Sequence, residues 1–142
     1  MRTDDERLLN GKQLRPDQDE VTVRVPALRR YVAALRSLTT ALAVQCDLTI
    51  DDIEDVQMAI DEACALLLPH VDRSRPWLEV EFHLVDASFV AQVQIATAAA
   101  ASIDRETLSW TVLAALCDEI TVSMDGRSLA VCFTKLRGAD RP

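Results

Sequence analysis

Glycine is scarce in this chain of 142 residues. Its three glycines are Gly11, Gly126 and Gly138, so none lies between Lys12 and Asp125. Backbone amides cradle a phosphate closely only where side chains are absent or where the loop adopts a positive φ. The sequence also contains neither a GxxxxGKS/T nor a GxGxxG motif. A glycine-rich phosphate loop within the body of the domain is therefore disfavoured.

Clustered metal ligands are missing as well. The chain has four cysteines and two histidines, His70 and His83, and no two cysteines form a CxxC pair. Because zinc sites usually need clustered thiols or imidazoles, we expect no metal site. We interpret the cysteines as small, structural side chains in a reducing compartment, without a redox role. They are Cys46, Cys64, Cys117 and Cys132, the last being the most exposed if the outer face of its sheet is uncovered.

Long apolar runs and an excess of positive charge are also absent. No stretch approaches the roughly 18 apolar residues of a membrane span, and the acidic residues 1–20 do not resemble a signal peptide. Fifteen Lys and Arg against 23 Asp and Glu give a net charge of −8. DNA and anionic membranes attract basic surfaces, so direct binding to either is disfavoured. We expect a cytoplasmic protein.

The size and composition are those of one globular domain. Hydrophobic residues make up 49% of the chain and charged residues 27%, which is typical of a folded protein. Residues 1–20 show no periodicity, and residues after 136 are polar. We therefore expect a flexible arm over residues 1–20, a single domain over residues 21–136 and a tail over residues 137–142.

Hydrophobic periodicity predicts eight elements in this domain. Apolar and polar residues alternate in five segments, which predicts five strands. In three other segments apolar residues recur every three or four positions, which predicts three helices. Pro26 suits the first turn of a helix that runs to about Val44, on an apolar stripe beginning at Leu28. Thr49 suits the N-cap of the next helix, and Pro69 ends or kinks it. The predicted strands are residues 21–25, 78–84, 89–95, 120–124 and 129–133, and the third helix is residues 109–116.

The order of these elements predicts an α+β fold. The predicted order is a strand, two helices, a hairpin, a helix and a second hairpin with an Asp-Gly turn. This order gives a mostly antiparallel sheet of about five strands. About three helices would cover one face of this sheet. We therefore predict a two-layer sandwich.

The segment MAIDEACALLLPH, residues 58–70, carries a resemblance to a known family. It resembles the N-box helix of the GHKL, or Bergerat-fold, ATPases in the branch of RsbW and SpoIIAB, the anti-sigma-factor serine kinases. That branch has a glutamate, an asparagine four residues later and often a histidine eight residues later. Glu62 and His70 fit, but Leu66 stands in place of the asparagine. Residues 21–44 and 109–136 are similar to the opening and the end of the family's domain, closest to its divergent actinobacterial UsfX type.

The departures from the family pattern concern its ATP site. The family's asparagine helps to hold magnesium, and the leucine side chain has no oxygen to offer. Residues 96–100, Ala-Thr-Ala-Ala-Ala, replace the Asp-x-Gly-x-Gly signature, and residues 104–110 contain no glycine. The resemblance thus implies a degenerate pocket without a cofactor, ATP with magnesium being the alternative. Glu62 would be the remnant of the catalytic residue, and Leu66 and His70 would occupy former cofactor-binding positions. Alternatively, Glu62 is simply solvated, and His70 caps the helix end.

The resemblance implies an anti-sigma factor. Such a protein sequesters an alternative sigma factor and is released by a STAS-type anti-anti-sigma partner, and it generally forms a homodimer. Arg29, Arg30 and Arg36 lie off the apolar stripe of the first helix, and we predict that they bind the partner. They could equally form an ordinary solvated face. An active ATP-binding serine/threonine kinase and a non-catalytic scaffold remain the alternative functions.

Overall fold

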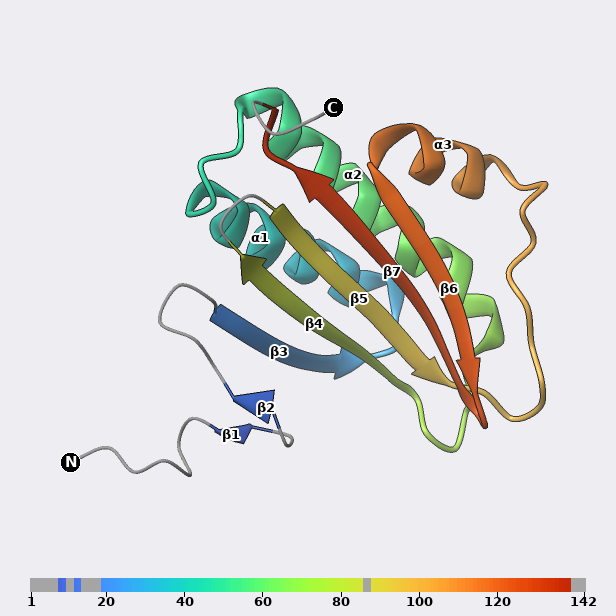
Figure 1. The fold of residues 1–142 in the computed structure, drawn as a ribbon. Helices are drawn as coiled ribbons and strands as arrows, with labels where there is room; N and C mark the ends of the chain where they lie inside the picture. Colours follow the sequence, from blue (N-terminus) through green and yellow to red (C-terminus); the bar gives the residue numbers. More distant parts are fainter. Residues whose placement is uncertain (1–7, 10–11, 14–18, 86–87, 139–142) are drawn as a thin grey trace.

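Alternating apolar and polar residues build a five-stranded antiparallel sheet with strand order β3-β4-β5-β7-β6 (Figure 1). The computed structural model describes residues 8–9, 12–13, 19–85 and 88–138. The strands are β3 (Asp19–Pro26), β4 (Trp77–Val85), β5 (Ser88–Ala96), β6 (Glu119–Asp125) and β7 (Ser128–Leu136). The short strands β1 (Leu8–Leu9) and β2 (Lys12–Gln13) pair with each other. Because β3 starts at Asp19, the sheet begins two residues before residue 21, and most of the expected arm lies outside the described residues.

Among the described residues, three α-helices cover one face of this sheet and none covers the other, which we call the open face (Figure 1). They are α1 (Arg29–Val44), α2 (Ile50–Leu67) and α3 (Leu108–Leu116), and the short 3-10 helix η2 (Leu68–His70) follows α2. The predicted α+β two-layer architecture is therefore confirmed.

The helix ends follow their capping residues. The Thr49 hydroxyl accepts a hydrogen bond from the Asp52 N–H at 3.1 Å, as the sequence predicts for the start of α2. The Thr107 hydroxyl caps α3 in the same way, accepting from the Trp110 N–H at 3.2 Å. At its other end α2 stops at Leu67, two residues before Pro69. The predicted end of this helix is thus confirmed.

The start of α1 differs from the prediction. Pro26 is the last residue of β3, opposite Trp77, and not the first turn of the helix. A proline is tolerated at the end of an edge strand, and the Ala27 N–H continues the contact by donating to the Pro76 carbonyl at 2.8 Å. The helix begins at Arg29, and Leu28, the first residue of the expected stripe, is 44% exposed.

The core lies between the helices and the inner face of the sheet. The side chains of Phe82, Phe89 and Phe133 are fully buried there, and the rings of Phe82 and Phe89 lie 5.8 Å apart in a tilted arrangement. Apolar residues of α2, among them Val56, Ile60 and Leu67, pack into the same core. The alternate residues of the strands, which are mostly polar, face away from the helices. This pattern is typical of an antiparallel sheet with one solvated face.

The second hairpin turns at Gly126, which has a φ of +61°. This left-handed conformation suits a residue without a side chain, and a Cβ built there meets no atom within 4 Å. The turn was predicted from the Asp-Gly pair. Among the described residues, no helix is long and apolar enough to cross a membrane.

A lysine lies on the inner face of β7, among apolar neighbours. Lys135 follows Val131 and Phe133 in the alternation, and its side chain is only 7% exposed. Its Nζ lies 2.8 Å from the Asp55 Oδ2 atom and 4.0 Å from the Asp52 Oδ1 atom, and it donates to the Leu116 carbonyl at 2.7 Å. The buried cation thus ties β7 to the first turns of α2 and to the end of α3.

Candidate functional site

A surface cleft of about 350 Å³ lies between α1 and α2. Arg29 and Arg36 line it from α1, Asp61 and Glu62 from α2, and Ser109 from α3. The helical spacing brings these residues to one place, because positions seven apart on α1 share a face. Three residues from the sequence prediction, Arg29, Arg36 and Glu62, therefore meet at one site.

The charges in this cleft are largely matched. The Arg36 Nε donates to both carboxylate oxygens of Asp61 at 3.0 Å. Both side chains are partly exposed, 45% and 34%, so this ion pair contributes at most about 1 kcal/mol to stability. Glu62 is half-buried beside it. The cleft therefore presents arginine side chains from α1 and a carboxylate from α2 to an incoming polar group.

The other two N-box positions do not point into this cleft. Leu66 is 6% exposed and belongs to the hydrophobic core. His70 is the last residue of η2 and lies outside the residues that line the cleft. On a continuous helix the three N-box positions, each four residues apart, would share one face, but α2 ends at Leu67, before His70. The three positions are therefore not gathered into one site.

The three arginines are also not gathered on a single patch. Arg29 and Arg36 line the cleft, whereas the Arg30 guanidinium lies 5.5 Å from the centre of the Tyr31 ring and outside the cleft lining. All three residues are exposed. The structure thus provides exposed positive charge along the first half of α1, with Arg36 already paired with Asp61.

Backbone hydrogen bonds and two arginines hold the segment that follows β5. The Thr97 N–H donates to the Arg127 carbonyl at 2.7 Å, and the Arg75 Nη2 donates to the Thr97 carbonyl at 3.0 Å. The Arg127 Nη1 donates to the Ala98 carbonyl. Arginine guanidinium groups therefore donate hydrogen bonds to backbone carbonyls within residues 96–100. The family signature has an aspartate and glycines in this segment.

Asp72 fixes Arg75 in this position. Its carboxylate accepts hydrogen bonds from the backbone N–H and the hydroxyl of Ser74 and from the Arg75 guanidinium. These bonds, the backbone one first, lower the pKa of Asp72. The carboxylate therefore stays ionised at neutral pH and holds the arginine toward residue 97.

The four thiols are poorly placed to react. Burial raises the pKa of Cys64 and of Cys117 to about 12, and it also raises the pKa of Cys46 and Cys132. A thiol reacts as its thiolate, so a raised pKa slows alkylation and oxidation. Cys132 lies on the open face of the sheet, as predicted, and it is half-buried there. These features support the predicted structural role of the cysteines.

Comparisons with known proteins connect the chain with RsbW. It is 32% identical over 71 residues to the serine-protein kinase RsbW of Halalkalibacterium halodurans, covering 50% of the chain and 43% of that protein. It is 35% identical over 52 residues to the RsbW of Bacillus thuringiensis, covering 37% and 32%. Over these segments the chain is similar to RsbW.

The likeness to RsbW extends to the fold. A crystal structure of the RsbU and RsbW domains of a Mycobacterium tuberculosis protein superimposes with a TM-score of 0.65 at 14% identity, over 83% of this chain and 32% of that one. The resemblance proposed from residues 58–70 and the predicted fold are both confirmed. The chain spans less than half the length of the RsbW proteins that it matches. No protein-family model matches it.

Two features of the structure were missed by the sequence analysis. One is the buried Lys135, although its place in the alternation after Phe133 is a signal that it faces inward. The other is the pairing of Arg36 with Asp61, because it depends on how α1 packs on α2.

Proposed function

We propose that this protein is an anti-sigma factor that works without nucleotide. The observation that carries the proposal is Leu66, a buried core residue at the position where the RsbW pattern has a magnesium-holding asparagine. A leucine buried in the core can neither coordinate a cation nor leave room for its hydration shell. The relationship to RsbW supports binding of a sigma factor, and a cytoplasmic location fits that role.

The residues present do not fit ATP with magnesium. Phosphoryl transfer needs a metal and backbone donors to neutralise charge on the phosphates. Here Leu66 has no ligand atom, and arginines hold the backbone at residues 96–100. These features support a degenerate ATP pocket, in which Glu62 would take no part in catalysis.

The exposed arginines of α1 are the proposed contact for the sigma factor. Arg29 and Arg30 carry no carboxylate partner among the ion pairs of the described residues, so that they can pair with acidic side chains of a partner. The net charge of −8 would favour a basic sigma factor and make association fall steeply with salt. Release would come from a STAS-type partner, and the protein itself would form a homodimer.

An active serine kinase is the second candidate function. It is favoured by the names of the RsbW relatives and by Glu62, which lies in a cleft beside Arg36. A kinase of this kind would bind Mg-ATP and transfer phosphate to a serine of its antagonist. A non-catalytic scaffold would bind neither Mg-ATP nor a sigma factor, and it would transfer no phosphate.

Two measurements separate these functions. The purified protein is titrated with Mg-ATP in a calorimeter, and it is also immobilised and exposed to each sigma factor of its source organism, with and without ATP. We expect no saturable heat from ATP, and capture of one sigma factor to the same extent in both conditions. A micromolar affinity for ATP, or capture only when ATP is present, would favour the kinase. Failure to capture any of them at low salt would favour the scaffold.

A further inference from the structure

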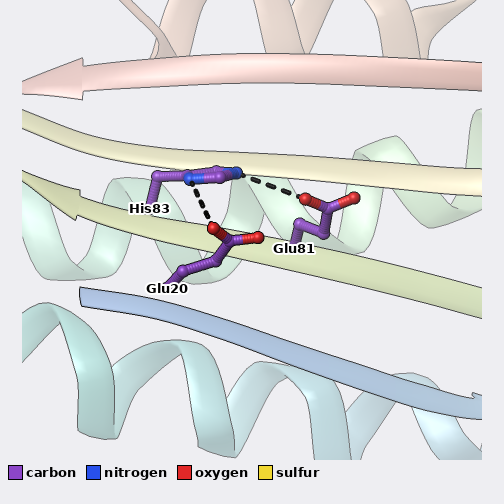
Figure 2. A group of neighbouring side chains, drawn as sticks. All are labelled: Glu20, Glu81 and His83. Atoms are coloured by element: carbon purple, nitrogen blue, oxygen red, sulfur yellow. Dashed lines mark ion pairs between the residues drawn. The ribbon is translucent and has the colours of Figure 1, made fainter. Parts of the chain in front are cut away.

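Three side chains with metal-binding atoms meet on the open face of the sheet. Figure 2 shows Glu20 reaching from β3 toward His83 on β4, and Glu81 approaching the same imidazole from the other side. One ring nitrogen and one oxygen of each carboxylate lie within 4.8 Å of one another. The His83 Nδ1 lies 4.0 Å from the Glu20 Oε2, and its Nε2 lies 3.4 Å from the Glu81 Oε1.

The antiparallel register creates this cluster. Glu20 and His83 are directly paired residues of β3 and β4, and Glu81 lies two residues from His83 on the same strand. Since residues two apart in a strand share a face, all three side chains stand on the side away from the helices. They therefore form a site unrelated to the cleft between α1 and α2.

Glu20 is the observation that indicates a missing ligand. Its side chain is only 4% exposed, yet its Oε1 atom has no hydrogen-bond partner among the described residues. A buried carboxylate oxygen without a partner is costly, because it has lost its hydration and gained nothing in return. A cation bound between Glu20, Glu81 and His83 would satisfy it.

We propose that Glu20, Glu81 and His83 bind a divalent transition-metal ion such as Zn²⁺. Two carboxylates and one neutral imidazole balance a charge of +2 and supply the oxygen and nitrogen ligands that zinc accepts. Mg²⁺ and Ca²⁺ prefer oxygen ligands alone, so the imidazole selects against both.

The proposed site requires only a small contraction. Ligand atoms around a tetrahedral zinc, at bonds of about 2.1 Å, lie roughly 3.4 Å apart. The present separations are as small as 3.4 Å and no larger than 4.8 Å. Rotation of the Glu81 and His83 side chains, which are 24% and 29% exposed, closes the difference. Three protein ligands leave room for water or for a group from a partner on the metal.

Equilibrium dialysis of the full, reduced chain against Zn²⁺ tests the proposal. We expect one equivalent of Zn²⁺ to bind, and we expect the variants E20Q, E81Q and H83Q to weaken binding at least about tenfold. Even a residue that only hydrogen-bonds to a metal ligand typically costs about this much in metal affinity when it is replaced. The controls are E79Q, on the same strand and face, and H70Q, which removes the other histidine. Both should bind Zn²⁺ as the unmodified chain does, and excess Mg²⁺ or Ca²⁺ should not displace it.

The proposal is overturned if the unmodified chain binds no zinc at micromolar concentration. Undiminished binding by H83Q or E20Q, or equal loss in E79Q and H70Q, would overturn it too. If the glutamine variants do not fold, the imidazole nitrogen resonances of the unmodified chain decide. Zinc should shift those of His83 and leave those of His70 in place, and unshifted His83 resonances refute the site.

Discussion

Replacement of Lys135 by methionine is expected to destabilise the domain by about 3 kcal/mol. Methionine fills a similar volume but removes the cation that lies 4.0 Å from the Asp52 carboxylate, a side chain only 4% exposed. Removing one partner of a buried ion pair costs about 3–5 kcal/mol. The lower end applies because the nearer partner, Asp55, is 34% exposed and regains hydration. Loss of the hydrogen bond to the Leu116 carbonyl contributes to the same sum.

Urea unfolding followed by circular dichroism measures this change. With a slope of about 2 kcal/mol per M, a loss of 3 kcal/mol lowers the midpoint by roughly 1.5 M. Arg36→Met is the matched control, because it removes a partly exposed ion pair and should cost no more than about 1 kcal/mol. Adding Asp52→Asn to Lys135→Met should cost less than the sum of the two single changes, since both remove the contact between these two side chains. A midpoint for Lys135→Met equal to that of Arg36→Met would refute this reasoning.

Four further predictions follow from the turn, the thiols, the first helix and the family resemblance. Gly126→Ala should cost about 1 kcal/mol in the same urea experiment, from the backbone strain at a φ of +61° alone, because the added Cβ meets open space. Alkylation of Cys64 and Cys117 by iodoacetamide, followed by mass spectrometry, should be slow at pH 7.5 and rise continuously up to pH 10, since a pKa of about 12 leaves few thiolates; a plateau near pH 8 would contradict this. Arg29→Glu with Arg30→Glu should weaken capture of the sigma factor at least about tenfold without lowering the melting temperature, whereas an unchanged affinity would move the contact elsewhere. Light scattering at tens of micromolar should give about twice the monomer mass of 15.7 kDa, and a persistent monomer would contradict the proposed homodimer.

Local patterns in the sequence predict most of the fold. Period-two alternation identifies all five strands of the main sheet, because each has one face in the core and one in solvent. Thr49 and Pro69 identify both ends of α2 for local steric and hydrogen-bonding reasons. The prediction that Pro26 starts a helix was wrong, because the fixed φ of proline suits the end of an edge strand as well as a first helical turn.

The candidate sites are harder to predict because they depend on which elements become neighbours. Glu20 and His83 are far apart in the chain and become paired only through the β3–β4 register. Arg36 meets Asp61 only after α1 has packed on α2. Lys135 could have been placed inward from the alternation, but its partners Asp52 and Asp55 could not have been identified without the position of α2 over β7.

The strand order has a consequence for how the domain matures during synthesis. β7, which leaves the ribosome after the other four strands of this sheet, lies inside the sheet, between β5 and β6. Until residues 128–136 have emerged, β6 has no neighbour in the sheet and β5 presents an unpaired backbone edge. Lys135, which ties β7 to α2, also arrives at this last step. The sheet of a nascent chain should therefore stay open until the β6–β7 hairpin has emerged.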